Sequence, residues 1–161
     1  DDDGAVAAEG EAGEIWARGP QVMQGYWRNE EATASVMSED GFFKTGDVAI
    51  YTQDGYYKIV DRKKDMAIVS GFNVYPTEVE NIIAELPDIV EAAVIGMPDA
   101  KTGEAIKAFC VRTGTSLNGS DVQDYCRENL AKYKVPKQVE FVDELPKSTV
   151  GKILRRELRK L

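Results

Sequence analysis

The alternation of hydrophobic and polar residues changes character near residue 61. Before that point, short segments such as 14–18 alternate with the period of two that is typical of half-buried strands. A helix capped by Asn29 and running to residue 37 interrupts them, and Asp54 followed by Gly55 predicts a hairpin turn. Two strand pieces, 42–44 and 47–51, are expected on either side of Thr45 and Gly46. The first sixty residues therefore predict a small antiparallel β unit.

After residue 65 the pattern alternates between helices and strands. Thr77 with Glu80, and Ser120 with Gln123, have the spacing of capping boxes, in which a side chain and a backbone amide satisfy each other reciprocally. The first of these helices is expected to end before Pro87, because proline does not continue a helix.

Three apolar runs, 89–97, 105–112 and 138–142, predict strands, and the polar segment 99–104 is expected to be a solvent loop. A last helix is predicted from about Lys152, with Leu154, Leu158 and Leu161 on one side and the arginines outward. The order of elements predicts an α+β fold, with a small antiparallel β unit followed by a compact α+β domain.

Charge is distributed unevenly along the 161 residues. Residues 1–60 hold 12 acidic and 4 basic residues, whereas residues 61–161 hold 16 of each, for a net charge of −8. This acidity argues against a general nucleic-acid-binding protein, which needs a dominant basic face. No apolar run approaches the roughly 18–20 residues that span a bilayer. Residues 1–12 are expected to be a frayed acidic lead-in, and the absence of an initiator Met indicates a piece of a longer protein.

The chain contains no histidine, which excludes Ser-His and Cys-His nucleophilic pairs and His-based metal sites within it. Cys110 lies in a strand-like run and Cys126 in a helical one, so both are predicted to be buried free thiols, consistent with a reducing cytosol. Any chemistry must therefore rest on lysines, arginines, carboxylates and backbone groups, and no residue is assigned to a metal.

Four residues are candidates for binding or catalysis, each with a plainer alternative. Asp47 on a tight turn can accept hydrogen bonds from a ribose diol, or can simply belong to an acidic turn. Arg62 can contact ribose or phosphate oxygens, or form a surface ion pair. Gly71 can let a ligand approach the backbone, or end a strand. Lys152 follows a glycine on a loop and can neutralise a developing negative charge, or begin a basic helix; the spacing of a P-loop is absent.

Several motifs occur together in one order. The segments 61–80 (DRKKDMAIVSGFNVYPTEVE) and 144–158 (ELPKSTVGKILRREL) stand out, preceded by GEI…GYW and FKTGD and separated by KYKVP. This series resembles the C-terminal third of the ATP-dependent, AMP-forming acyl-adenylating enzymes, a family that includes acyl-CoA synthetases, adenylation domains of peptide synthetases and luciferases. The sequences of segments 61–80 and 144–158 are most similar to those of bacterial long-chain fatty-acid–CoA ligases.

The resemblance implies a role for each matched residue. Asp47 matches the acidic residue that holds the ATP ribose hydroxyls, and Arg62 the arginine that contacts the same region. Lys64 matches the hinge about which the C-terminal domain turns between adenylate-forming and thioester-forming poses. Gly71 matches a glycine that lines the pantetheine tunnel, and Lys152 the lysine that bridges the acyl carboxylate and the α-phosphate.

The resemblance also implies a division of the chain and a reaction. Residues 1–63 would be the last β subdomain of a large N-terminal domain, and 64–161 the mobile C-terminal domain. The whole protein would convert fatty acid, ATP and CoA into acyl-CoA, AMP and pyrophosphate, with Mg²⁺ bound by residues outside this chain. Its partner would be the rest of its own chain, its location the cytoplasm, with peripheral contact at the inner membrane left open. Ile68 stands where some relatives carry a lysine for the second half-reaction, so that role is not assigned.

The phosphate loop and acyl pocket are missing from the sequence, so this polypeptide alone is predicted to be inactive. One alternative is a relative that activates another acyl or aryl acid, or an adenylation domain. Another is a non-catalytic module whose basic end, residues 147–160, docks on anionic lipid or nucleic acid.

Overall fold

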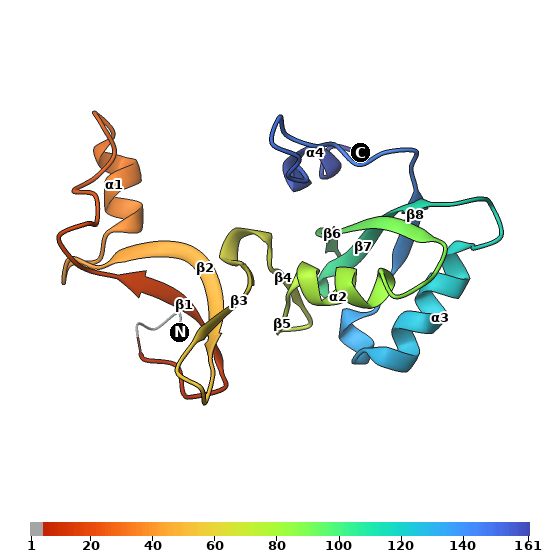
Figure 1. Ribbon diagram of the computed structural model, residues 1–161, viewed down its shortest axis with the longest axis horizontal. Helices are drawn as coiled ribbons and strands as arrows, with labels where there is room; N and C mark the ends of the chain where they lie inside the picture. The colour runs from red at the N-terminus through yellow and green to blue at the C-terminus, as the bar shows by residue number, and fades with distance from the viewer. Residues whose placement is uncertain (1–4) are drawn as a thin grey trace. The chain divides into compact units, whose positions relative to one another are not determined.

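The computed structural model describes residues 5–161, and the chain divides into two compact units, Asp1–Lys64 and Asp65–Leu161. The first four residues of the predicted acidic lead-in lie outside the described residues. The mixture of short helices with mainly antiparallel sheets confirms the predicted α+β fold (Figure 1).

The first unit contains a three-stranded antiparallel sheet in the order β1-β2-β3. Asn29 caps the helix as predicted, since its Oδ1 accepts a hydrogen bond from the Ala32 amide at 3.0 Å. The predicted β2–β3 hairpin is present, and the Thr52 amide donates to the Tyr56 carbonyl at 2.8 Å across its loop. The elements are β1 (Ala12–Ala17), α1 (Glu30–Val36), β2 (Phe43–Tyr51) and β3 (Tyr57–Arg62).

The prediction of two strand pieces around Thr45 and Gly46 is wrong, because β2 runs through these residues as one strand. The register of β1 against β2 shifts between Glu14 and Trp16, so that β2 carries extra residues at this point. Gly46 has φ +72°, a backbone conformation that a residue with a side chain rarely adopts. The segment is therefore a β-bulge within a strand, and Asp47 is the last of its extra residues before β1 and β2 pair again at Val48.

The second unit is organised around the strand β7. The strand β6 pairs with it in antiparallel fashion along one edge, β8 pairs in parallel along the other, and β4 joins at Gly103 with β5 outside it. The elements are η1 (Lys63–Asp65) at the junction of the units, β4 (Ala67–Val69), β5 (Phe72–Val74), α2 (Pro76–Ile83), β6 (Ile89–Asp99), β7 (Gly103–Arg112), α3 (Gly119–Asn129), η2 (Lys132–Lys134), β8 (Gln138–Phe141) and α4 (Arg155–Leu158).

Alternate residues of β6 and β7 build two hydrophobic clusters, because successive side chains of a strand point to opposite faces. One cluster lies under α2 and α3 and includes Val94, Ile106 and both cysteines, which are buried and free as predicted. The other includes Ile95 and Phe109 and is closed by Leu145, Ile153 and Leu158 of the C-terminal segment. In Figure 1, α2 and α3 accordingly lie on one side of this sheet and α4 on the other.

The predicted capping box of Thr77 and Glu80 is wrong. The helix α2 begins at Pro76, with Tyr75 at the N-cap position and no side-chain cap hydrogen bond. Proline suits the first helical position because it lacks the amide that would need a partner there and its φ is already close to helical. The Glu80 carboxylate accepts a hydrogen bond from the Val94 amide at 2.8 Å, which ties α2 to β6.

A capping box does start α3, but two residues earlier than predicted from Ser120 and Gln123. The Asn118 Oδ1 accepts from the Asp121 amide at 3.2 Å, and the Asp121 Oδ2 accepts from the Asn118 amide at 2.8 Å. The Gln123 side chain instead donates to the Pro136 carbonyl at 3.0 Å. Asparagine is at least as good an N-cap as serine, so the earlier start is physically reasonable.

The last helix is shorter than predicted. The segment 99–104 is not a solvent loop throughout, because its ends belong to β6 and β7. Asp99 pairs with Gly103, so only a tight turn joins β6 to β7. The Lys152 carbonyl accepts from the Ser148 amide at 2.8 Å, which commits it to a hairpin rather than to a helix. The helix α4 therefore starts only at Arg155. Its Leu158 is buried as predicted.

Two expectations for the face of this helix are wrong. Leu161 is exposed, so it does not continue the apolar side that Leu158 begins. The Arg155 side chain is not outward, since only 18% of it is exposed.

Candidate functional site

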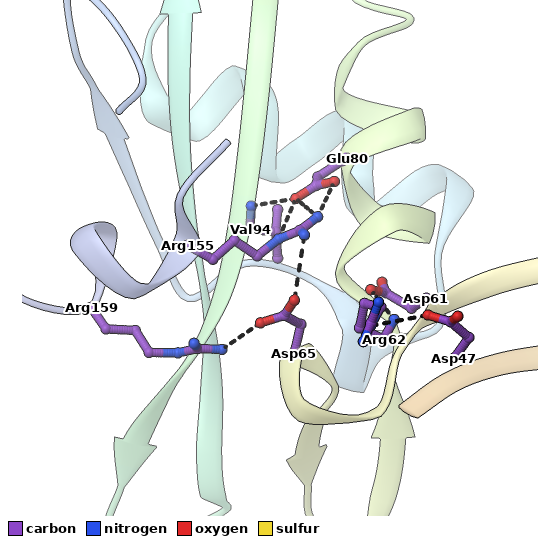
Figure 2. Close-up of polar contacts among 8 residues, drawn as sticks. All are labelled: Asp47, Asp61, Arg62, Asp65, Glu80, Val94, Arg155 and Arg159. Atoms are coloured by element: carbon purple, nitrogen blue, oxygen red, sulfur yellow. Dashed lines mark hydrogen bonds and ion pairs between the residues drawn. The ribbon is translucent and has the colours of Figure 1, made fainter. Parts of the chain in front are cut away.

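Asp47 and Arg62, the two predicted nucleotide-binding residues, face each other on neighbouring strands. They are register partners of β2 and β3, and the Arg62 Nε lies 3.0 Å from the Asp47 Oδ1 (Figure 2). The Arg62 Nη2 also donates to the Thr45 carbonyl at 3.4 Å, and the Asp47 amide donates to the Thr45 hydroxyl at 3.1 Å. Contacts with the bulge therefore hold the Asp47 and Arg62 side chains next to each other on the first unit.

Glu14 of β1 supports this bulge. Its Oε1 accepts from the Gly46 amide at 3.0 Å, and its Oε2 lies 3.1 Å from the Lys63 Nζ. Burial alone would raise the pKa of Glu14, but hydrogen bonds from Lys63, Trp16 and the Gly46 amide outweigh burial and leave the pKa below its ordinary value. Glu14 is therefore ionised near neutral pH and fixes the glycine of the bulge.

The pair of Asp47 and Arg62 remains accessible to a ligand. The side chains are 34% and 50% exposed, so the ion pair contributes at most about 1 kcal/mol to stability. The Asp47 Oδ2 has lone pairs for vicinal hydroxyl donors, and the guanidinium has N–H groups beyond those already used. The arrangement can bind a polyhydroxyl or anionic group without losing a structural contact.

Lys64 lies in the 3₁₀ turn η1 and is exposed. The chain divides into its two compact units between Lys64 and Asp65. This places the residue at the boundary in the sequence, while its role as a hinge remains a prediction.

Gly71 lies in a two-residue hairpin turn between β4 and β5, where Val69 pairs with Phe72. Both central residues have positive φ, 53° at Ser70 and 83° at Gly71, as in a type I′ turn. A Cβ at Gly71 would meet no atom within 4 Å, so the glycine is required by conformation and not by crowding. The simple reading of a strand end is thereby refined to the tip of a hairpin.

The rest of the unit braces this hairpin. The Ser70 amide donates to the Thr102 carbonyl at 2.8 Å, and the Ile68 amide donates to the Glu104 carboxylate at 2.6 Å. The Phe72 ring stacks on Tyr133 with centroids 4.6 Å apart. The Ile68 and Phe72 side chains are about half exposed, so the hairpin offers an apolar rim beside its glycine.

A cavity of about 920 Å³ opens next to the hairpin, between Ser70 and Tyr133. Basic side chains contribute to its lining, among them Lys101 and Lys132, and its remaining surface is largely apolar. Such a cavity can receive an anionic ligand with an apolar part.

Lys152 lies on a second hairpin, closed by the bridge between Lys147 and Ile153. The Ser148 side chain accepts from the Lys152 amide at 3.1 Å, and Gly151 has φ +79°. The residue is exposed, and within residues 5–161 its ammonium has no hydrogen-bond or ion-pair partner. A free cation on a short turn can approach an external anion without first breaking an ion pair.

The structure does not bring Gly71 and Lys152 together. Gly71 is at the tip of a hairpin that extends the edge of the sheet, whereas Lys152 belongs to the segment that covers the face opposite α2 and α3. The two residues therefore belong to different surfaces of the second unit.

A charged cluster that includes arginines of the segment after Lys152 was not predicted from the sequence. It consists of two carboxylates and two guanidinium groups (Asp65, Glu80, Arg155 and Arg159). These residues are far apart in the sequence, and no local pattern indicates their pairing. The only available signal is the pair of arginines three and seven residues after Lys152, which the amphipathic pattern had placed outward.

No group of three or more His, Cys, Asp or Glu side chains among residues 5–161 is arranged to hold a metal ion. Within the same residues, no helix is both long and apolar enough to cross a membrane.

Residues 78–152 match the family described as the AMP-binding enzyme C-terminal domain. The chain carries an AMP-binding enzyme C-terminal domain. The resemblance seen in the motifs is thereby confirmed. The chain is 55% identical over 159 residues to a long-chain-fatty-acid–CoA ligase of Yersinia pestis, a match that covers 99% of the chain but 28% of that relative. It thus spans a little over a quarter of the ligases it matches.

Solved structures agree with this assignment. ATP-bound MatB from Rhodopseudomonas palustris matches 96% of the chain with a TM-score of 0.90 and 44% identity, over 31% of its own length. The o-succinylbenzoate CoA synthetase of Bacillus subtilis, in complex with an acyl-adenylate intermediate, matches 98% with a TM-score of 0.86 and 37% identity, over 32% of its length. Both solved proteins therefore contain the fold of the AMP-binding enzyme C-terminal domain together with that of the β unit that precedes it.

Proposed function

We propose that the chain is the C-terminal part of a long-chain fatty-acid–CoA ligase. In the first half-reaction, the fatty-acid carboxylate attacks the α-phosphorus of ATP and pyrophosphate leaves. In the second, the CoA thiol attacks the carbonyl of the acyl-adenylate and AMP leaves. The identity of 55% to a long-chain-fatty-acid–CoA ligase, against 44% to MatB and 37% to the o-succinylbenzoate CoA synthetase, supports a long-chain acid as the substrate.

The observation that carries the proposal is the isolated Lys152 ammonium. Attack of a carboxylate on ATP brings two anions together, so a cation placed at the α-phosphate stabilises the transition state more than the separated substrates. The short hairpin presents such a cation, with no competing partner among the described residues. Lys152 is therefore the proposed catalytic residue of adenylation.

Asp47 and Arg62 would bind the nucleotide. The exposed Asp47 carboxylate fits the ribose hydroxyls, and Arg62, at 3.0 Å, both orients that carboxylate and offers donors to the same region. Mg²⁺ is the expected companion of ATP. Its ligands would be supplied by the nucleotide and by parts of the protein beyond residues 5–161, which contain no suitable cluster.

Gly71 and the cavity beside it would serve the second half-reaction. Gly71 adds no side chain at the hairpin tip that could obstruct a pantetheine arm, and the basic lining next to Ser70 suits an anionic ligand such as CoA. Lys64, at the boundary of the two units, would be the point about which the domain turns.

The test is Lys152→Ala in the full-length protein that contains this chain. The barrier to adenylation should rise by about 3–4 kcal/mol, by analogy with the loss of an oxyanion donor. Pyrophosphate release that depends on the acid measures this step. The rate at which added acyl-adenylate and CoA form acyl-CoA measures the second half-reaction. An unchanged adenylation rate would remove Lys152 from catalysis.

A panel of long-chain, medium-chain and aryl acids in the same assay tests the substrate class. Greatest turnover with an aryl acid would favour the alternative acid-activating enzymes. The docking-module alternative is weakened by the structure, because Arg156 and Lys160 at the basic end both pair with Glu157.

A further inference from the structure

Two adjacent arginines that follow Lys152 differ sharply in environment. Only 18% of the Arg155 side chain is exposed, whereas 77% of Arg156 is exposed. Arg156 pairs only with its neighbour Glu157 among the described residues. Arg155 therefore has a role in the interior of the second unit that Arg156 does not share.

Arg155 forms a forked contact with Glu80. Its Nη2 donates to the Oε1 and the Oε2 of Glu80 at 2.8 Å each, and its Nε donates to the Oε1 at 3.3 Å. The Arg155 Nη1 lies 3.7 Å from the Asp65 Oδ2 (Figure 2). A planar guanidinium in such a fork is fixed in direction as well as in distance.

The carboxylates are themselves held by other elements. Glu80 also accepts from the Val94 amide at 2.8 Å, so its position is set by α2 and β6 together. Asp65 directly follows Lys64 and receives the Arg159 Nη2 at 3.3 Å. As Figure 2 shows, Asp65 lies between the two arginines, and the cluster balances two negative charges against two positive ones.

The Lys152 hairpin needs an anchor outside itself. Its backbone hydrogen bonds, such as the one from the Gly151 amide to the Ser148 carbonyl at 2.9 Å, close on the hairpin itself. The partly exposed ion pair of the Lys147 Nζ with the Glu91 Oε1, at 2.6 Å, joins the base of the hairpin to β6 but does not reach its tip. The helix that follows has four residues and an N-cap without a side-chain hydrogen bond, so it does not hold its own orientation. Packing of Ile153 and Leu158 keeps the segment on the sheet, but apolar contact is not directional.

We propose that Arg155 is a positioning residue for Lys152. Its fork to Glu80 and Asp65 sets the direction in which the Lys152 hairpin leaves the domain, and it links that direction to the residue next to the proposed hinge. The inference rests on the proposed function, because positioning matters only if Lys152 acts in adenylation.

The experiment uses the full-length ligase with Arg155→Lys, which keeps the charge but loses the fork. Pyrophosphate release should slow by about tenfold to a hundredfold, the effect of a displacement of roughly 1 Å at a catalytic group. Conversion of supplied acyl-adenylate with CoA should be little changed. The matched control is Arg156→Lys, at the adjacent exposed arginine, which should leave both half-reactions unchanged.

Combining Arg155→Lys with Lys152→Ala distinguishes a positioning role of Arg155 from a general loss of structure. If Arg155 acts through Lys152, Arg155→Lys should cause no further loss of adenylation in the Lys152→Ala background. Equal losses in both backgrounds, or equal losses in both half-reactions, would overturn the proposal. If Lys152→Ala alone has no effect, the catalytic role of Lys152 fails and the positioning role of Arg155 fails with it; if only Arg155→Lys has none, the positioning role alone fails.

Glu80→Gln provides a second test, because it removes the carboxylate charge that the Arg155 guanidinium binds. It should reproduce the selective loss of adenylation with native secondary structure by circular dichroism. If neither Arg155→Lys nor Glu80→Gln yields a folded enzyme, the cluster serves stability alone and the positioning role is rejected.

Discussion

Substitutions of Gly71 test whether the glycine is required by the backbone conformation of the β4–β5 turn or by the space around it. Because a Cβ there would meet nothing within 4 Å, Gly71→Ala should cost only the strain of φ +83°, about 1–2 kcal/mol. Asparagine visits this backbone region more readily than alanine, so Gly71→Asn should cost less. The order of stability is therefore expected to be glycine, then asparagine, then alanine.

Urea unfolding of this chain measures the effect, and the two units can be followed separately. The helices α2 and α3 dominate the far-ultraviolet dichroism and lie in the second unit, whereas Trp16 and Trp27 both lie in the first. With a slope of about 2 kcal/mol/M, Gly71→Ala should lower the dichroism midpoint by about 0.5–1 M. Tryptophan fluorescence should not shift.

The same variants then test catalysis in the full-length protein that contains this chain. Gly71→Asn keeps the turn but adds a side chain at the hairpin tip, so the thioester step should slow while adenylation stays unchanged. Equal slowing of both steps would contradict a role for Gly71 beside the CoA arm. Equal destabilisation by asparagine and alanine would refute the account of the turn.

Three further substitutions or conditions test other parts of the chain. Lys64→Pro fixes φ and removes an amide at the proposed hinge, so overall turnover measured as acyl-CoA should fall while pyrophosphate release in the first turnover is kept; unchanged turnover would count against the hinge. Leu158→Ala should lower the free energy of unfolding by about 2–5 kcal/mol in urea titrations, whereas the exposed Leu161→Ala should change it by no more than about 0.5 kcal/mol. Burial raises the pKa of Cys110 to about 12 and of Cys126 to about 11, from 9.0, so both thiols should resist a thiol reagent at pH 8 until the chain unfolds. Since the folded state keeps protons that the unfolded state releases, their stabilising effect is complete below pH 9 and is lost as the pH rises toward 12.

Local patterns predicted the elements whose signals are strong and short-range. The apolar runs became β6, β7 and β8, and Asn29 caps α1. The errors fall where two local signals compete. The helix α2 begins at Pro76, so Thr77 is already inside it and is not its N-cap. The N-cap of α3 is Asn118 and not Ser120. The β-bulge at Gly46 looked like a break, because a bulge and a turn use the same residue types.

For the candidate site, the sequence named candidate residues but not the contacts that they make. Asp47 and Arg62 were chosen separately, and only the register of β2 against β3 makes them partners. Arg155 was placed outward because a helix was expected to begin at Lys152. The hairpin before it delays the helix and turns that arginine toward Glu80, 75 residues away in the sequence. Pairing over such a distance depends on the tertiary fold, which local periodicity does not contain.

The positions of Gly71 and Lys152 bear on why a ligase of this kind would need a moving domain. Both residues belong to one compact unit, yet one lies at a sheet-edge hairpin and the other on the segment that covers a sheet face. A rigid unit in a single orientation would therefore not present both to the same reacting carbonyl. Adenylation requires a cation at the α-phosphate, whereas thiolysis requires an open path for the thiol. The proposed turn about Lys64 would satisfy both demands in sequence, and the Asp65–Arg155–Glu80 contacts, which begin one residue beyond it, would carry Lys152 along as part of the same rigid body.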